Sequence, residues 1–329
     1  STAGDIKLRE AAADFVADKY NLDYDPETEV IATVGATEAL AATLFSLLNP
    51  GDYVLVPSPY FSLYASLVKM SQAVPIYMDT TKTNFIVTPE LIEETITQLD
   101  DIPKAIILNY PNNPTGVTWT KDEVKALAHT IANYSGMLAV SDEIYSEIVY
   151  DSSHVSLGAY LREQTIVING LSKSHAMTGW RLGLIFAPKH IADELVKTHQ
   201  VLVTSASSIT QFAGIEALTQ GRDDAMPMVA AYRERRDIII KTLKNLHFEV
   251  SEPKGAFYIF SAIPSELNIN SYDFCYGFAK TYHVAMVPGD AFGEAGEGYF
   301  RISYASSLDD IKTAMDRLKD YVNELRKVQ

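Results

Sequence analysis

Short apolar runs alternate with amphipathic segments through the first half of the chain, from about residue 30 to residue 187. Apolar runs of this length are typical of buried β-strands, whereas apolar positions that recur every three to four residues are typical of helices. The strand-like runs cover residues 30–34, 53–56, 105–108, 138–142 and 165–169. The alternation predicts an α/β fold in which a mostly parallel sheet is sandwiched between helices.

The pattern changes after Pro188. Helical stretches continue to about residue 246, with a break near residues 221–227. Strand-like runs near 256–261 and 300–304 are then mixed with helical segments over 271–282 and 308–325. We therefore expect a large domain over residues 1–220 and a smaller α+β domain over residues 221–329. A long helix that joins them would allow a hinge that closes on a substrate.

Composition excludes several classes of function. The 329 residues carry a net charge of −15, which disfavours nucleic acid or an anionic membrane as a partner. No apolar run approaches the roughly 20 residues of a membrane span, and no signal peptide is visible, so we expect the cytoplasm. The single cysteine, Cys275, excludes an internal disulfide and is expected to be a small buried hydrophobe. The seven histidines show no metal-ligand spacing with carboxylates, so no metal site is predicted.

The segment 170–183 carries the clearest candidate chemistry. Lys173 and Arg181 stand eight residues apart among small and apolar residues, directly after a strand-like run. A lysine in an apolar pocket loses its proton readily, as imine formation requires, and an arginine offers a planar set of donors that suits a phosphate. For this segment alone, a surface lysine beside a tight turn is an equally good interpretation.

Polar residues also follow two other predicted strands. Asn113 precedes a Pro-Thr-Gly segment after the strand at 105–108, and Asp142 and Tyr145 follow the strand that starts at Leu138. The carboxyl ends of parallel strands form the edge where open α/β sheets bind ligands. Taken singly, Asn113 is better explained by an Asn-Pro turn and Asp142 by a helix N-cap.

Two further segments follow predicted strands. Gly35, Ala36 and Thr37 lie between a strand and an amphipathic helix, so their backbone N–H groups are free to bind an anion, although a simple capped helix start is an alternative interpretation. Tyr60 and Phe61 follow the strand at 53–56, and either aromatic residue can belong to the core.

The order of asparagine, acid, tyrosine, lysine and arginine resembles that of the fold-type I pyridoxal-phosphate enzymes, the aspartate aminotransferase group. This resemblance covers nearly the whole chain and implies pyridoxal 5′-phosphate as the cofactor. It implies that Lys173 holds the cofactor aldehyde as an imine and then moves the substrate proton, and that Asp142 pairs with the pyridine nitrogen. Asn113 and Tyr145 would bind the ring oxygen.

The same resemblance implies roles for the remaining candidates. The turn at Gly35, Ala36 and Thr37 would bind the phosphate together with Arg181. Phe61 would stack on the pyridine ring, with Tyr60 as the alternative. Several relatives carry a phosphate-binding serine where this chain has Gly170, and Ser172 is expected to replace it in part.

One candidate lies near the C-terminus. Arg301, in an apolar strand-like run, would bind the substrate α-carboxylate, with Asn113 assisting. An edge-strand arginine that points to water is the alternative for Arg301. We interpret residues 255–258 as packing of the smaller domain.

The predicted activity is transfer of an amino group between an L-amino acid and a 2-oxo acid by a ping-pong mechanism. A β-elimination lyase acting on sulfur amino acids is the alternative, because it would use the same residues. A cofactor-binding sensor module of a transcription regulator is disfavoured, since the acidic chain shows no basic DNA-binding domain. The preferred amino acid is not predicted.

The resemblance also implies a homodimer with shared active sites. Residues 1–9 resemble the middle of a family segment whose earlier tyrosine reaches the neighbouring subunit's phosphate, and that tyrosine is absent here. The resemblance implies that the N-terminal part of the small domain is missing as well. We expect this form of the chain to keep the dimer but to have an incomplete lid over each site.

Overall fold

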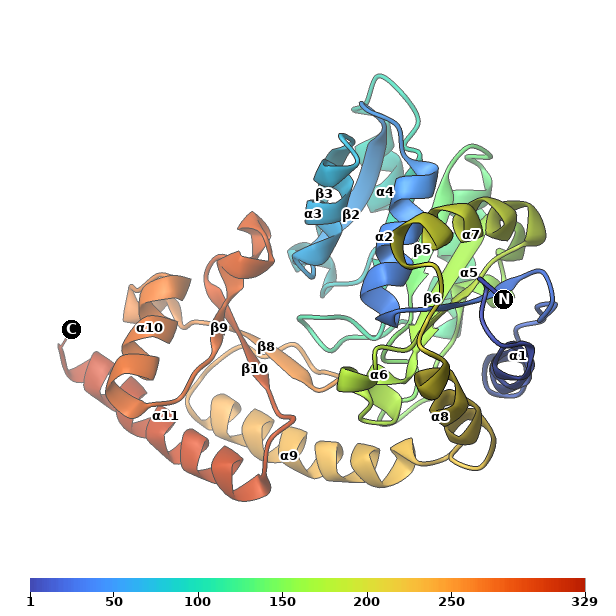
Figure 1. The fold of residues 1–329 in the computed structure, drawn as a ribbon. Coiled ribbons are helices and arrows are strands. Elements are labelled where there is room, and N and C mark those ends of the chain that lie inside the picture. The colour runs from blue at the N-terminus through green and yellow to red at the C-terminus, as the bar shows by residue number, and fades with distance from the viewer. Residues whose placement is uncertain (329) are drawn as a thin grey trace.

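The computed structural model describes residues 1–328 and contains one large and one small sheet (Figure 1). The large sheet has the order β1-β7-β6-β5-β4-β2-β3. Its strands are β1 (Val30–Thr33), β2 (Tyr53–Ser58), β3 (Val74–Asp79), β4 (Ala105–Asn109), β5 (Leu138–Asp142), β6 (Thr165–Gly170) and β7 (Gly183–Phe186). All neighbours pair in parallel except β7, which is antiparallel to β1 and β6. The predicted α/β class with a mostly parallel sheet is confirmed.

Successive residues of the central strands face opposite helical layers, as the twofold period of a strand requires. Val54 and Val56 pack toward α2 (Gly35–Leu47), α3 (Leu63–Met70) and α7 (Lys189–Val203). Leu55, between them, packs toward α4 (Pro89–Ile96) and α5 (Lys121–Ala132). The helices α1 (Ile6–Tyr20) and α8 (Ser208–Thr219) cover the face on which α4 and α5 lie, near β1, β6 and β7. Because both faces are covered, the central parts of β4, β5 and β6 are apolar on both sides of the sheet, and polar residues stand at the ends of these strands.

The C-terminal elements build a second core around a three-stranded antiparallel sheet of order β8-β10-β9. Its strands are β8 (Tyr258–Ala262), β9 (Val287–Pro288) and β10 (Tyr299–Ser303), and its helices are α9 (Ala225–Asn245), α10 (Ser271–Tyr282) and α11 (Leu308–Val328). In Figure 1, α9 leads away from α8 toward the elements around this small sheet. The second core also includes Ile144 and Tyr145 from the segment after β5, so the two parts of the chain share apolar contacts.

Two local expectations need correction. The helix expected from Thr37 begins at Gly35, because the chain turns directly out of β1 through a glycine with a positive φ of 78°. The break expected at 221–227 is shorter, since α8 ends at Thr219 and α9 begins at Ala225 with Pro227 in its first turn, where a proline costs no hydrogen bond.

No helix among residues 1–328 is long and apolar enough to cross a membrane. Within the same range, no group of three or more His, Cys, Asp or Glu side chains is arranged to hold a metal ion.

Candidate active site

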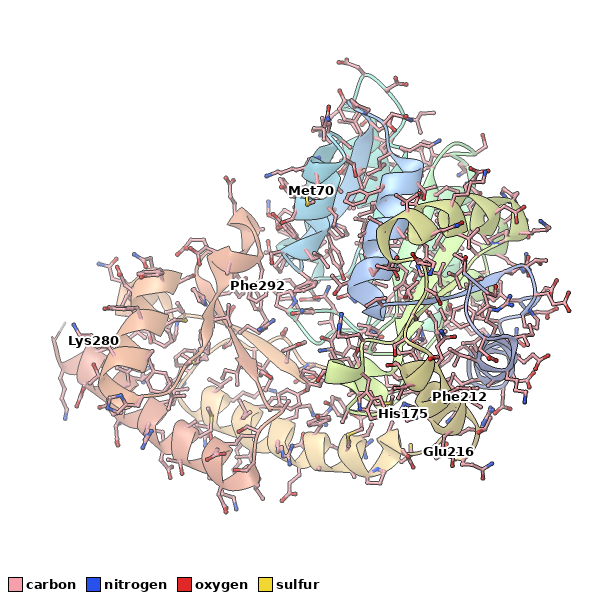
Figure 2. All side chains as sticks on the ribbon, viewed as in Figure 1. Met70, His175, Phe212, Glu216, Lys280 and Phe292 are labelled. Atoms are coloured by element: carbon pink, nitrogen blue, oxygen red, sulfur yellow. The ribbon has the colours of Figure 1, made fainter. Side chains whose placement is uncertain are left out.

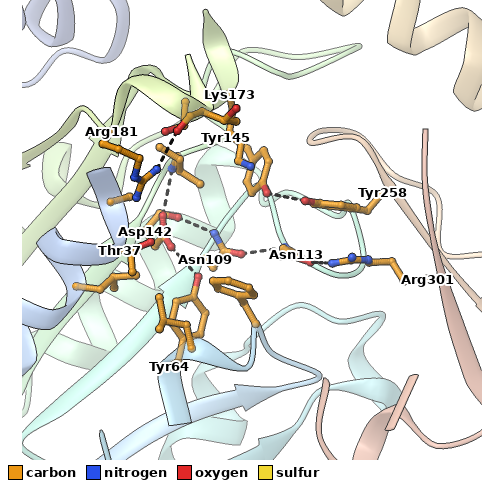
Figure 3. Close-up of a pocket in the computed structure, with 17 residues that line it drawn as sticks. Thr37, Tyr64, Asn109, Asn113, Asp142, Tyr145, Lys173, Arg181, Tyr258 and Arg301 are labelled. Atoms are coloured by element: carbon orange, nitrogen blue, oxygen red, sulfur yellow. Dashed lines mark hydrogen bonds between the residues drawn. The ribbon is translucent and has the colours of Figure 1, made fainter. Parts of the chain in front are cut away.

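A cavity of about 310 Å³ lies where the carboxyl ends of the parallel strands face the small sheet (Figure 3). Ten of the residues that the sequence singled out line it: Ala36, Thr37, Phe61, Asn113, Asp142, Tyr145, Ser172, Lys173, Arg181 and Arg301. Parallel pairing explains the convergence, because β4 and β5 end side by side with Asn109 opposite Asp142. Of the two candidate aromatics, Phe61 lines the cavity, whereas Tyr60 stacks on Tyr77 outside it.

Asp142 is the last residue of β5 and is buried, yet its carboxylate has donors on both oxygens. Tyr64 Oη donates to Oδ2 at 2.7 Å, and the Ile144 N–H donates to Oδ1 at 3.3 Å. Burial raises the pKa of Asp142 to about 6, although the bond from Tyr64 and the charge of Lys173 both act to lower it. A cationic ring nitrogen bound next to this carboxylate would stabilise its ionised form.

Lys173 lies in α6 (Leu171–Ser174), the single helical turn that follows β6. Its Nζ lies 5.8 Å from the ring centre of Tyr145 and 5.6 Å from that of Phe257. Burial lowers the pKa of Lys173, and the positive charges of Arg181 and Arg301 lower it further, whereas Asp142 acts to raise it. Nζ forms no hydrogen bond or ion pair within residues 1–328, so the amine is available for reaction.

Arg181 lies against the first turn of α2. A Cβ atom at residue 35 would lie 2.4 Å from Arg181 Nη2, so only glycine lets the guanidinium approach this turn. Arg181 Nη1 also donates to the Thr178 carbonyl at 3.0 Å. The free N–H groups at the start of α2 and the adjacent guanidinium together form an anion site, although Gly35 itself does not line the cavity.

A side chain at position 170 would meet the backbone of a neighbouring segment. A Cβ atom at residue 170 would lie 2.8 Å from the carbonyl oxygen of Leu182, the residue just before β7. Ser172, two residues further on, is buried and lines the cavity.

Arg301 enters the cavity from the small sheet. Its Nη1 donates to Asn113 Oδ1 at 2.8 Å, and its guanidinium lies between the rings of Tyr258 and Phe292, 4.5 Å and 4.7 Å from their centres. Arg301 Nε is buried and has no partner among the described residues. Since β10 is the middle strand of its sheet, the alternative of an edge-strand arginine directed to water is wrong.

Sequence reasoning missed four polar residues of the cavity, namely Tyr64, Asn109, Thr178 and Tyr258. The Asn109 side chain bonds both flanking segments, donating to the Asp142 carbonyl at 2.9 Å and accepting from the Asn113 N–H at 2.8 Å. Tyr258 was interpreted as packing, but its hydroxyl lies 2.9 Å from that of Tyr145. Strand alternation in β8 could have directed Tyr258 to the same side as Arg301.

These groups fit pyridoxal 5′-phosphate. Its phosphate suits the anion site at Gly35 and Arg181, its ring nitrogen suits Asp142, and its aldehyde suits the unpaired amine of Lys173. The unpartnered Nε of Arg301 leaves a donor for a second, carboxylate-bearing molecule.

Comparison with known proteins decides the family. The family described as aminotransferase class I and II matches residues 1–318. The chain belongs to this family. A probable N-acetyl-LL-diaminopimelate aminotransferase of Bacillus subtilis is 44% identical over 324 residues, which cover 98% of this chain and 81% of the relative. An aspartate aminotransferase of Pyrococcus horikoshii is 39% identical over 323 residues, covering 96% and 81%.

Solved structures agree with this assignment. The aromatic aminotransferase from Pyrococcus horikoshii matches with a TM-score of 0.94 and 34% identity, covering all of this chain and 88% of that one. The Thermus thermophilus aspartate aminotransferase with maleate matches with a TM-score of 0.91 and 35% identity, covering 97% and 82%. The predicted family, aminotransferase activity and pyridoxal-phosphate cofactor are confirmed, and the enzyme acts on amino acids and 2-oxo acids. The relatives favour this activity over the lyase and the sensor module.

Proposed function

We propose that this aminotransferase works in the 310 Å³ cavity, with Lys173 as the residue that holds the cofactor and moves the substrate proton. The observation that carries the proposal is an unpaired lysine amine, with a lowered pKa, in one cavity with a buried carboxylate and two arginines. When bound, pyridoxal 5′-phosphate supplies an aldehyde that bonds amines and a ring that withdraws electrons from the substrate α-carbon.

The chain's own residues then have separate tasks. Asp142 keeps a negative charge beside the ring nitrogen, and Tyr64 holds that carboxylate in place. Lys173 would take the proton from the substrate α-carbon and hold it on Nζ, and its lowered pKa favours the free amine that this step needs. We expect ping-pong kinetics, because the first 2-oxo acid has to leave this one cavity before the second can bind.

The remaining residues position the two ligands. Arg301, which bonds Asn113, would orient the substrate carboxylate together with it. Asn113 and Tyr145 would hold the cofactor ring oxygen. The turn at Gly35, Ala36 and Thr37 would bind the phosphate together with Arg181 and Ser172, and Phe61 would stack on the ring.

Reductive labelling tests the assignment of Lys173. Borohydride treatment of the enzyme with its cofactor should attach the label to the peptide that contains Lys173, and a label on any other lysine contradicts the proposal. A panel of amino donors with 2-oxoglutarate then defines the substrate, and it should include N-acetyl-LL-diaminopimelate, aspartate and aromatic amino acids. Glutamate formation without release of ammonia or thiol is the expected result for every accepted donor.

We also propose a homodimer. Large apolar side chains are exposed on consecutive helices of the chain, which is costly unless another surface covers them. They include Val201 on α7, Ile209 and Phe212 on α8, and Met226 on α9, with exposed fractions of 86%, 74%, 64% and 61% (Phe212 is labelled in Figure 2). Light scattering at micromolar concentration should show a dimer for the wild type and weaker dimerisation for Phe212→Asp. A monomeric wild type would contradict the proposal.

For the domain organisation we propose the boundary near residue 220, because α8 ends at Thr219 and α9 starts at Ala225. Limited proteolysis should then cut within this short connection before it cuts either core. We further propose the cytoplasm as the location, which fractionation of the source cells would test.

A further inference from the structure

A buried histidine lies directly behind the anion site. His199 on α7 is fully buried, and its Nδ1 lies 3.0 Å and 3.1 Å from the two carboxylate oxygens of Glu38. Its Nε2 lies 3.1 Å from the carbonyl oxygen of Thr2. Glu38 Oε2 also accepts the Val34 N–H at 3.0 Å, at the point where the chain enters α2.

The partners of His199 determine where its protons are. A carbonyl oxygen can only accept, so Nε2 must carry a hydrogen to bond Thr2. An ionised carboxylate can likewise only accept, and Glu38 already accepts the Val34 N–H, so Nδ1 carries a hydrogen toward it as well. With both ring nitrogens donating, the ring is an imidazolium and its charge cancels that of Glu38. The pair is therefore neutral as a whole.

The neutrality of the Glu38–His199 pair matters because the pair lies beside the anion site. Glu38 follows Thr37 directly in the first turn of α2, the turn that Arg181 approaches at Gly35. A carboxylate without a cation at this place would repel a phosphate, and it would do so strongly because the surroundings are buried. The carboxylate is nevertheless useful there, since it binds the Val34 N–H and leaves the following N–H groups for the ligand.

We propose that His199 is a positioning residue of the phosphate site: it neutralises Glu38 and fixes the first turn of α2 for binding the cofactor phosphate. Thr2 in the N-terminal segment completes the arrangement. This segment is held against β1, because the Ala32 N–H donates to the Ala3 carbonyl oxygen. This inference rests on the proposed function, because it assumes that the phosphate binds at this turn.

The experiment compares pyridoxal 5′-phosphate with pyridoxal, which lacks the phosphate, in the full chain freed of cofactor. His199→Gln keeps a donor toward Thr2 but leaves Glu38 charged. We expect it to weaken binding of pyridoxal 5′-phosphate about ten- to hundredfold, and binding of pyridoxal by less than about twofold, because pyridoxal has no phosphate to be repelled. The double variant Glu38→Gln/His199→Gln removes both charges and should recover most of the affinity. His190→Gln, an exposed position on the same helix, is the matched control and should bind both ligands as the wild type does.

The outcomes separate the possible failures. Equal weakening for both ligands, or no recovery in the double variant, assigns His199 a packing role only and overturns the inference. Nitrogen-15 NMR gives a reading that does not depend on the cofactor: both ring nitrogens of His199 should carry a hydrogen in the folded protein, and a ring with a single N–H also overturns the inference. If the wild type binds the two ligands equally, or if borohydride labels a lysine other than Lys173, the proposed function itself fails.

Discussion

The two sides of the cavity are built in different ways. On the side of the large sheet, the functional side chains stand at or just after strand ends, and backbone pairing fixes them relative to one another, as with Asn109 and Asp142. On the side of the small sheet, Arg301 and Tyr258 project from neighbouring strands of a separate core. Their polar contacts across the cavity are made by side chains alone, namely Arg301 with Asn113 and Tyr258 with Tyr145.

This difference suggests a division of work. Groups fixed by a parallel sheet keep their geometry through a reaction cycle and suit the cofactor and the proton transfer. Groups held across the cavity by side-chain hydrogen bonds can break and re-form these bonds, which suits a substrate that enters and leaves. Substitutions on the large-sheet side should therefore reduce kcat, and substitutions on the small-sheet side should act on KM.

Lys173→Ala should have the largest effect, because it removes the proton carrier on the large-sheet side. We expect kcat to fall by about four orders of magnitude. Cofactor affinity should fall much less, since Arg181, Asp142 and the first turn of α2 remain. Steady-state kinetics and equilibrium dialysis measure the two quantities. A loss of affinity as large as the loss of kcat would mean that Lys173 serves mainly as an anchor.

Asp142→Asn tests how strongly burial at the end of β5 disfavours the charged form of the carboxyl group. The folded pKa of Asp142 is raised to about 6, above the value of 3.8 for an exposed carboxyl. The folded protein therefore holds a proton that the unfolded chain has lost, and this group's contribution to stability declines as the pH rises from about 4 to 6. In the cofactor-free protein, Asp142→Asn should remove that decline, a difference of about 2 to 3 kcal/mol in the free energy of unfolding.

Chemical denaturation between pH 4 and 7 measures this difference. Tyr64→Phe is the matched variant, because the bond that it removes lowers the pKa of Asp142. Its decline should extend to higher pH than that of the wild type. Parallel curves of unfolding free energy against pH for the wild type and Asp142→Asn would contradict a raised pKa of Asp142 in the folded protein.

Arg301→Lys tests the small-sheet side. A lysine keeps the charge but loses the planar set of donors, so KM should rise about ten- to hundredfold for every amino acid and 2-oxo acid, with kcat nearly unchanged. Initial rates across the donor panel measure this effect. If KM rises for some substrates only, Arg301 binds a side chain rather than the shared carboxylate.

The same division explains what the sequence could predict. Lys173, Asn113 and Asp142 follow apolar runs that read as strands, and parallel strands bring their carboxyl ends together, so local patterns were enough to place these residues near one another. The antiparallel strand β7 was not predicted, because four apolar residues carry no information on direction. The roles of the individual residues stay predictions until they are tested.

The residues that were missed depend on long-range packing. Tyr64 lies in α3, and its neighbours in the sequence are those of an ordinary core aromatic residue. Only the folded structure brings its hydroxyl to Asp142, 78 positions away. Tyr258 belongs to the small core by sequence, and its partner Tyr145 is 113 positions away. No local period specifies how two separate cores meet, so the contacts across the cavity were the least predictable part of the site.

Tyr258→Phe should have the smallest effect and is the sharpest test of the contact between the two sides. It removes the hydroxyl that lies 2.9 Å from Tyr145 Oη but keeps the ring beside Arg301. One hydrogen bond of about 1 kcal/mol corresponds to roughly a fivefold change in kcat/KM. If Tyr258 acts through the hydroxyl of Tyr145, Tyr145→Phe and the double variant should show equal losses, because no bond remains to be broken. If the two losses add instead, Tyr258 contributes independently of Tyr145, and the two sides of the cavity are not linked through this pair.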